Sequence, residues 1–156
     1  MAYKDAFGMI TDFGRDEGKD LNGAVTVTHF GSVHQLEIDW DFDRDGVLKA
    51  TGDDLTIRSA KVPAGAAILS TKVVVLKAAA TASTTLDVGL VKLDGTAIDA
   101  DGLLAAGALS AGVLTGEGAL IGKINGADDG YIKLTPSAET AAALGGLKAR
   151  VIIDYV

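Results

Sequence analysis

Cysteine is absent from this chain of 156 residues, and aromatic residues make up only 5% of it. Disulfides and thiolate chemistry are therefore excluded, and cysteine usage gives no indication of the compartment. The shortage of aromatic residues argues against the aromatic-lined cleft in which paired carboxylates hydrolyse glycosides. The sequence contains no apolar run of about 18 residues that would predict a membrane span. Its first residues also lack the basic and apolar regions of a signal peptide.

Basic residues are outnumbered, and the net charge is −7. The imbalance lies in residues 1–54, which carry 12 acids and 5 bases, whereas residues 55–156 carry 9 of each. Because a phosphate backbone requires a basic face, we do not expect a nucleic-acid partner. The acidic part has two interpretations, a solvated surface or a surface that docks on a basic protein.

Sequence motifs for catalysis are also missing. The chain has no G-x-S-x-G, which exposes a nucleophilic serine, and no GxxxxGK[ST] phosphate loop. Its two histidines, His29 and His34, are too few for a zinc site without cysteine. We therefore expect no enzymatic activity and no cofactor.

One acidic segment has the opening of a calcium loop. Asp41, Asp43 and Asp45, followed by Gly46, match D-x-D-x-D-G, in which alternate carboxylates converge on a hard cation. The twelfth position should be a bidentate glutamate, but it is Gly52. Strand alternation and turn formation explain the same aspartates, so calcium is the weaker of the two interpretations.

Glycine and aspartate are abundant and predict many turns. Glycine occurs 20 times, and 17 of the 21 acidic residues are aspartate, which favours turns over helix interiors. Residues 62–65 (Val-Pro-Ala-Gly) predict a turn with Pro63 second and Gly65 last. Asp94-Gly95 predicts a hairpin turn.

Between the turns, alternating apolar residues predict short strands. Residues 33–42 (VHQLEIDWDF) form the clearest amphipathic strand, and Ala67–Leu76 is apolar on both faces, which predicts a central strand covered on both sides. Residues 101–109 predict a short helix that begins at Asp101, or a glycine-rich loop, and residues 136–146 a loop or one helical turn. The further predicted strands are Ala24–Phe30, Val47–Ala50, one from Leu55, Leu86–Leu90, Ala119–Ile124, Tyr131–Thr135 and Leu147–Tyr155.

Eight or nine strands at this spacing predict an all-β fold, an antiparallel β-sandwich of jelly-roll type with at most one or two short helical turns. Residues 24–156 are predicted to form this single domain. Residues 1–23 show no sustained period and are predicted to form an extended arm. Its exposed apolar residues would be a liability unless they meet a partner; they are Phe7, Met9, Ile10 and Phe13.

Several strings in residues 55–156 occur in the same order in a known group of proteins. They are VPAGAAILSTKVVVL, TTLDVGLVKLDGTAIDADGL, DGYIKLTPSAET and KARVIIDYV. The chain resembles small virion proteins of tailed bacteriophages, the capsid decoration or cement proteins. The resemblance implies a β-sandwich or jelly-roll protein on the capsid surface that assembles as dimers or trimers. No catalytic residues belong to this pattern.

We therefore expect a structural virion protein, made in the bacterial host cytoplasm, that binds junctions between major capsid subunits and stabilises the shell. The expected partners are the major capsid protein and further copies of the chain, with no membrane involved. Two other classes stay open, a carbohydrate-binding or adhesion module and, with less support, a small β-fold hydrolase. The residues expected to make contacts are Phe7, Met9, Ile10, Phe13, Glu37, Asp39, Asp41 and Asp43.

Overall fold

The structure is a computed structural model. It describes the backbone of residues 2–4, 10–14, 24–45 and 56–156, and the side chains of residues 31–45 and 60–156. The predicted strand Val47–Ala50 lies outside the described residues.

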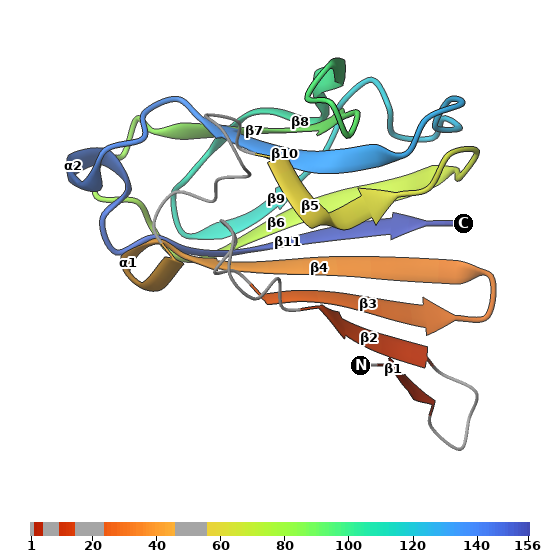
Figure 1. The fold of residues 1–156 in the computed structure, drawn as a ribbon. Coiled ribbons are helices and arrows are strands. Elements are labelled where there is room, and N and C mark those ends of the chain that lie inside the picture. The colour runs from red at the N-terminus through yellow and green to blue at the C-terminus, as the bar shows by residue number, and fades with distance from the viewer. Residues whose placement is uncertain (1, 5–9, 15–23, 46–55) are drawn as a thin grey trace.

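Two antiparallel sheets form the body of the protein (Figure 1). The seven-stranded sheet has the order β1-β2-β3-β4-β11-β6-β9, and the four-stranded sheet has the order β5-β10-β7-β8. The strands of the larger sheet are β1 (Ala2–Lys4), β2 (Ile10–Gly14), β3 (Ala24–Phe30), β4 (Val33–Asp41), β6 (Ile68–Lys77), β9 (Gly112–Thr115) and β11 (Lys148–Tyr155). Those of the smaller sheet are β5 (Thr56–Val62), β7 (Thr85–Val91), β8 (Ala97–Ala108) and β10 (Gly130–Pro136).

Strands β4 to β11 have jelly-roll connectivity. The order β4-β11-β6-β9 in one sheet faces β5-β10-β7-β8 in the other. Every connection between consecutive strands crosses from one sheet to the other, except the one between β7 and β8. Eight strands wound in this way form a jelly roll. The predicted all-β sandwich of jelly-roll type is confirmed.

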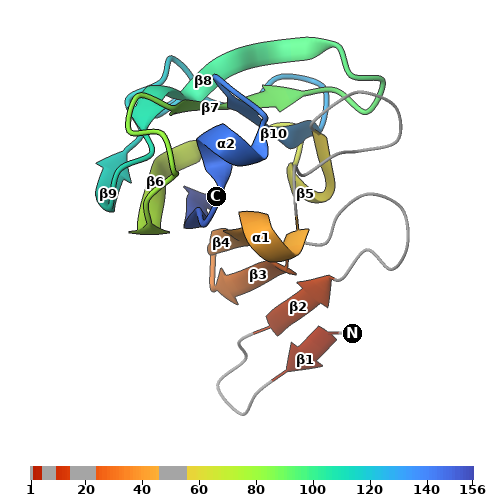
Figure 2. The ribbon, with the colours of Figure 1, turned by 90° about the vertical axis from the view of Figure 1, so that its left-hand side faces the viewer.

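The core lies between the two sheets (Figure 2), where alternate residues of facing strands are buried. Trp40 and Tyr155 belong to this core, as their positions on apolar strand faces predict. The larger sheet contributes Leu36, Ile38, Val73, Val75, Val151 and Ile153, and the smaller sheet contributes Leu86, Val88, Leu90, Leu103, Ile132 and Leu134.

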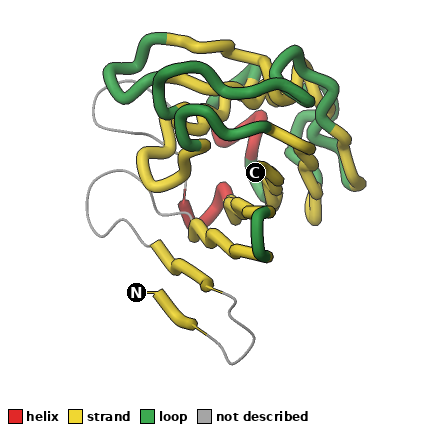
Figure 3. Tube along the Cα trace, turned by 90° about the vertical axis from the view of Figure 1, so that its right-hand side faces the viewer, coloured by secondary structure: helices red, strands yellow, loops and turns green. Residues whose placement is uncertain are grey.

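The larger sheet continues past β4 through three more strands. β3 pairs with β4, β2 with β3, and β1 with β2, all antiparallel. In Figure 3, β1 and β2 extend away from the two-layered body. The described part of residues 1–23 thus adds an edge to the sheet, and the division into an arm and a domain stays a prediction.

Two expectations for residues 101–124 are wrong. Residues 101–109 form neither a helix nor a loop, because they lie mostly in β8, which pairs with β7 through three register shifts. Pairing with a neighbouring strand gives these residues the backbone hydrogen bonds that a helix would otherwise supply. Residues 119–123 form turns and a bend, and the strand in this region is β9, which pairs with β6.

The prediction that β6 is covered on both sides is also wrong. Val73 and Val75 are buried toward the core, whereas Lys72 and Leu76 on the other face are exposed. β6 lies between β11 and β9 in its sheet, but no element packs on its outer face among the described residues. The described residues therefore leave the outer face of β6 uncovered.

The short elements agree better with expectation. Residues 136–146 contain one helical turn, α2 (Ala141–Leu144), whose N-cap is Thr140, and α1 (Phe42–Asp45) follows β4. The turn at Pro63 closes one residue later than predicted, because the amide of Ala66 donates to the carbonyl of Pro63 (3.2 Å). Gly65 is thereby third in the turn, where its φ of 78° suits glycine. Neither helix in the described part is long or apolar enough to cross a bilayer.

Candidate functional site

The acidic strand β4 is largely neutralised by its neighbour β11. Arg150 donates to both carboxylate oxygens of Asp39 (2.6 and 3.0 Å) and lies 3.8 Å from Glu37. Lys148 lies 2.9 Å from Asp41, and its hydrogen bond lowers the pKa of that aspartate. Because β4 and β11 pair in register, each base is opposite an acid. The strand therefore presents a matched set of charges rather than an acidic surface.

The calcium candidates are directed to three different partners. Asp45 is buried, accepts two hydrogen bonds from Arg44 and accepts a third from the amide of Asp41 (3.0 Å). Asp43 accepts from the amide of Gly146 (2.9 Å), and Asp41 pairs with Lys148. No group of three or more His, Cys, Asp or Glu within the described ranges is placed to hold a metal ion. Asp45 instead binds Arg44 and the amide of Asp41 at the end of β4. Asp43 binds the amide of Gly146, just before β11.

The predicted contact residues of the arm are only partly described. Phe7 and Met9 lie outside the described residues. Ile10 and Phe13 belong to β2, where Ile10 is opposite His29 and Phe13 is opposite Thr26 in β3. The pairing of β3 with β4 places His29 opposite His34. The ring of His34 stacks on that of Tyr155, with the ring centroids 5.2 Å apart.

A hollow of about 530 Å³ lies at one end of the sandwich, where three loops that are distant in sequence meet. They are the turn after β5, the β7–β8 hairpin and the loop before β10. Loops held at the end of a rigid sandwich are common binding sites. The lining residues are Ala64, Lys92, Leu93, Asp94, Ala127, Asp128, Asp129 and Tyr131.

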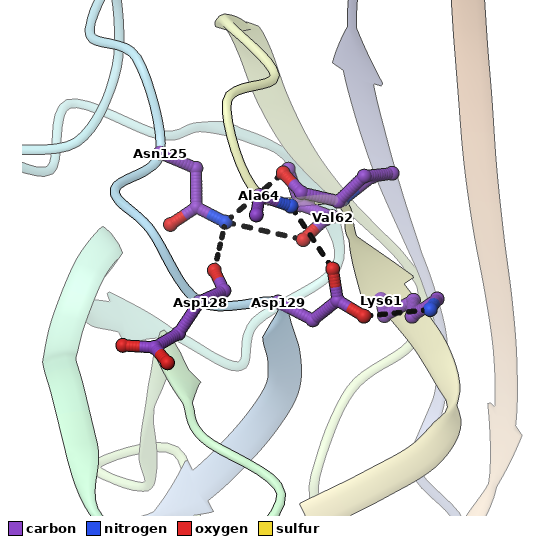
Figure 4. A network of polar contacts seen from close by, with 7 residues as sticks. Lys61, Val62, Ala64, Asn125, Asp128 and Asp129 are labelled. Carbon is purple, nitrogen blue, oxygen red and sulfur yellow. Dashed lines mark hydrogen bonds and ion pairs between the residues drawn. The ribbon is translucent and has the colours of Figure 1, made fainter.

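A buried amide holds two of these loops together (Figure 4). Asn125 is 2% exposed, and its Nδ2 donates to the carbonyls of Val62, Pro63 and Asp128 (3.1–3.2 Å). Asp129 accepts from the amide of Ala64 (3.0 Å) and from Lys61 Nζ (2.7 Å). These hydrogen bonds join the turn after β5 to the loop before β10, two of the three loops that line the hollow. The sequence signal for this network is weak, because Asn125-Gly126 resembles an ordinary turn.

Two of the acids at the hollow have lowered pKa values. The amide of Thr96 lowers the pKa of Asp94, and Lys61 lowers the pKa of Asp129. A general acid needs a raised pKa. Asp128 forms an ion pair with Lys92 (2.8 Å). Asp94 and Asp129 are thus ionised hydrogen-bond acceptors at neutral pH.

Exposed large aliphatic side chains gather on the outer face of the larger sheet. Six are strongly exposed among residues 31–45 and 60–156. One, Leu93, belongs to the β7–β8 hairpin. Of the other five, Leu69 and Leu76 lie on β6, and Val113 lies on β9. Val156 and Ile124 lie beside the start of β6, where Ala67 pairs with Val156 on one side and bridges to Ile124 on the other.

A second hollow, of about 220 Å³, opens beside Leu76 on the same outer face. Its charged lining consists of the paired β4 and β11 residues together with Arg44. Sequence reasoning identified the apolar outer residues of β6 but assumed that another element covers them. The bases Lys148 and Arg150 stand in the sequence of a predicted strand, but the sequence does not reveal their register against the acids of β4.

Comparison with known proteins gives one informative result. Protein-family models give no match to the chain, and curated proteins give none either. Among solved structures, a chain of the "Cyanophage Pam1 capsid asymmetric unit" is similar, with a TM-score of 0.50 and 18% identity, over 91% of this chain and 89% of that chain. At this identity the similarity concerns the fold. The jelly roll described above is therefore a fold that this chain shares with a chain of a phage capsid.

Proposed function

We propose that the protein is a structural component of a phage virion and has no catalytic activity. The observation that carries this proposal is the fold itself, shared over nearly the whole length of both chains with a chain of a phage capsid asymmetric unit. Jelly rolls recur in capsid proteins, where sheets and loops serve as contact surfaces. The partner in this proposal is the major capsid protein of the same phage.

Within that role, we propose that the protein decorates the outer capsid surface and cements junctions between major capsid subunits. The resemblance of residues 55–156 to decoration proteins supports this role. A cement protein stabilises a shell by burying surface between subunits.

Co-sedimentation tests the decoration role. Shells assembled from the major capsid protein of the same phage are mixed with the full chain and pelleted. We expect the protein in the pellet and an increase in the melting temperature of the shells, since ligands that bind only the assembled state stabilise it. A full chain that stays in the supernatant and leaves shell melting unchanged would contradict the role.

A truncated chain tests the contact assignment separately. Deleting residues 1–23 should leave a folded domain, because the eight strands of the jelly roll begin at β4. Our assignment of the arm as a contact predicts that this variant no longer pellets with shells. Retained binding would reject the arm as a contact while leaving the decoration role intact.

A second candidate function is glycan binding at the hollow between the loops. Tyr131 and Leu93 offer apolar surface there, and the ion pair of Lys92 with Asp128 offers groups that bind hydroxyls. A glycan array separates the two functions: reproducible hits that Tyr131→Ala abolishes would favour an adhesion module. An array without hits, beside co-sedimentation with shells, favours the decoration role.

A further inference from the structure

We propose that two copies of the chain associate through the outer face of the larger sheet, with β11 along a two-fold axis. This inference deepens the proposed function by naming the surface through which copies of the chain meet. It starts from the strand β6, whose sequence predicts two covered faces, while the described part of the chain covers only one.

The apolar part of this face is contiguous. Val74 on β6 is directly opposite Val113 on β9, and Leu76 lies two residues further along β6 on the same face. Leu76 is 65% exposed and Val113 is 63% exposed. Neighbouring residues of one sheet face that are this exposed and this apolar typically mark a site of protein association.

The charges of the face are arranged asymmetrically. Strand β4 carries Glu37, Asp39 and Asp41, whereas β6 carries Lys72 and Lys77 and no acid. Neither of these lysines forms an ion pair with any described residue. On the same face β11 adds Lys148, Arg150 and Asp154, so β4 and β11 together carry four acids and two bases. A face with an excess of acid at one side and only bases at the other can complement a second copy of itself.

One symmetry operation satisfies this complementarity. In the register of the sheet, Ile152 on β11 lies between Glu37 on β4 and Lys72 on β6. A two-fold axis along β11 places β4 of each copy over β6 of the other. Each outward residue of β11 then faces its own counterpart, so Ile152 meets Ile152, and Arg150, which is paired with Asp39 of its own chain, meets Arg150. Glu37 faces Lys72 of the second copy. A two-fold axis across the strands would instead bring the acids of β4 onto each other.

The same two-fold axis places the exposed Leu76 of each copy against the hollow of about 220 Å³ in the other copy. The face is large enough to matter, since four strands spaced about 4.8 Å apart and about 27 Å long cover about 500 Å² on each copy. The two faces together exclude about 1,000 Å² from water, the size at which specific association begins.

The mass of the protein in solution tests the proposal. Light scattering after size exclusion, over a dilution series from about 100 µM, should show a dimer for the full chain. Leu76→Glu should weaken it at least about tenfold, because a carboxylate would be buried in the interface. Leu93→Glu is the matched control, since Leu93 is 56% exposed but lies on the β7–β8 hairpin, and it should leave the dimer unchanged.

A charge swap tests the orientation. Lys72→Glu and Glu37→Lys should each weaken the dimer about tenfold, and the double variant should restore it, because the two side chains oppose each other across the axis. Thermal melts verify that every variant is folded. A wild-type protein that is monomeric at all concentrations would overturn the proposal. So would a double variant whose loss of dimer affinity equals the losses of the two single variants combined. Because no shell is present, either result is independent of the co-sedimentation test.

Discussion

At the scale of single residues, Asn125 does more for the loops than any acid around it. Its amide group reaches three carbonyls from two different connections while the side chain is almost fully buried. A buried carbonyl that loses its donor retains the cost of desolvation without compensation. The arrangement of the loops around the hollow therefore depends on the side chain of Asn125.

We predict that Asn125→Ala lowers the free energy of unfolding by about 2–3 kcal/mol, since several buried carbonyls lose their donor. Asn125→Asp should cost more, because the new oxygens face the carbonyls of Val62, Pro63 and Asp128. Urea denaturation measures both values. Ala127→Ser, on the exposed part of the same loop, is the control. Equal midpoints for all four proteins would show that the network contributes nothing.

The pair of Asp129 with Lys61 predicts a dependence of stability on pH. The pKa of Asp129 is lowered from its ordinary value of 3.8, first by Lys61 and then by the amide of Ala64. The stabilisation is therefore complete above the pKa of the unfolded chain and is lost as pH falls from there through the folded value. Because Asp129 is partly exposed, solvent screening keeps the effect small.

Acid titration of the unfolding midpoint tests this sign. Between pH 5 and pH 2, the range that includes the titration of aspartate, wild type should lose stability more steeply than Asp129→Asn. The exposed Asp101 in β8 provides the comparison. A variant with Asp101→Asn should follow the wild-type curve. Parallel curves for wild type and Asp129→Asn would refute a coupling between this carboxylate and folding.

At the scale of strands and turns, most of the fold follows from sequence. Period-2 patterns located β4, β6, β7, β10 and β11, because their buried and exposed faces alternate with few interruptions. The patterns failed in β8, where Leu103 and Leu104 are consecutive and both buried. Register shifts in its pairing with β7 break the alternation, and no local signal reveals them. The loops of the hollow were identified as turns, but only the jelly-roll topology shows that they meet.

The close approach of β7 to β8 explains why β7 has a glycine, Gly89, in its interior. A Cβ at Gly89 would lie 2.2 Å from the carbonyl oxygen of Ala100. We predict that Gly89→Ala lowers the free energy of unfolding by at least about 2 kcal/mol, because a backbone must move. Gly126→Ala is the matched control, since nothing lies within 4 Å of its Cβ. Thermal denaturation of both variants should show a clear loss only for the first.

At the scale of the whole molecule, the two sheets differ in a way that bears on assembly. The smaller sheet faces β4, β11, β6 and β9 of the larger one, and the larger sheet continues beyond it through β3, β2 and β1. The outer face of the larger sheet holds most of the strongly exposed aliphatic side chains in the described part of the chain. Sequence patterns marked the outer face of β6 as apolar, and only the fold showed that it is open.

The position of β11 also bears on how the protein is made. This strand follows all the other described strands in the sequence, yet it lies in the interior of its sheet, between β4 and β6. While the ribosome is still synthesising the chain, β4 and β6 have no partner on the sides that β11 will occupy. Open strand edges of this kind invite pairing with other chains. Native pairing on these sides of β4 and β6 must therefore wait until β11 has been synthesised, and a ribosome that stalls before that point would favour aggregation.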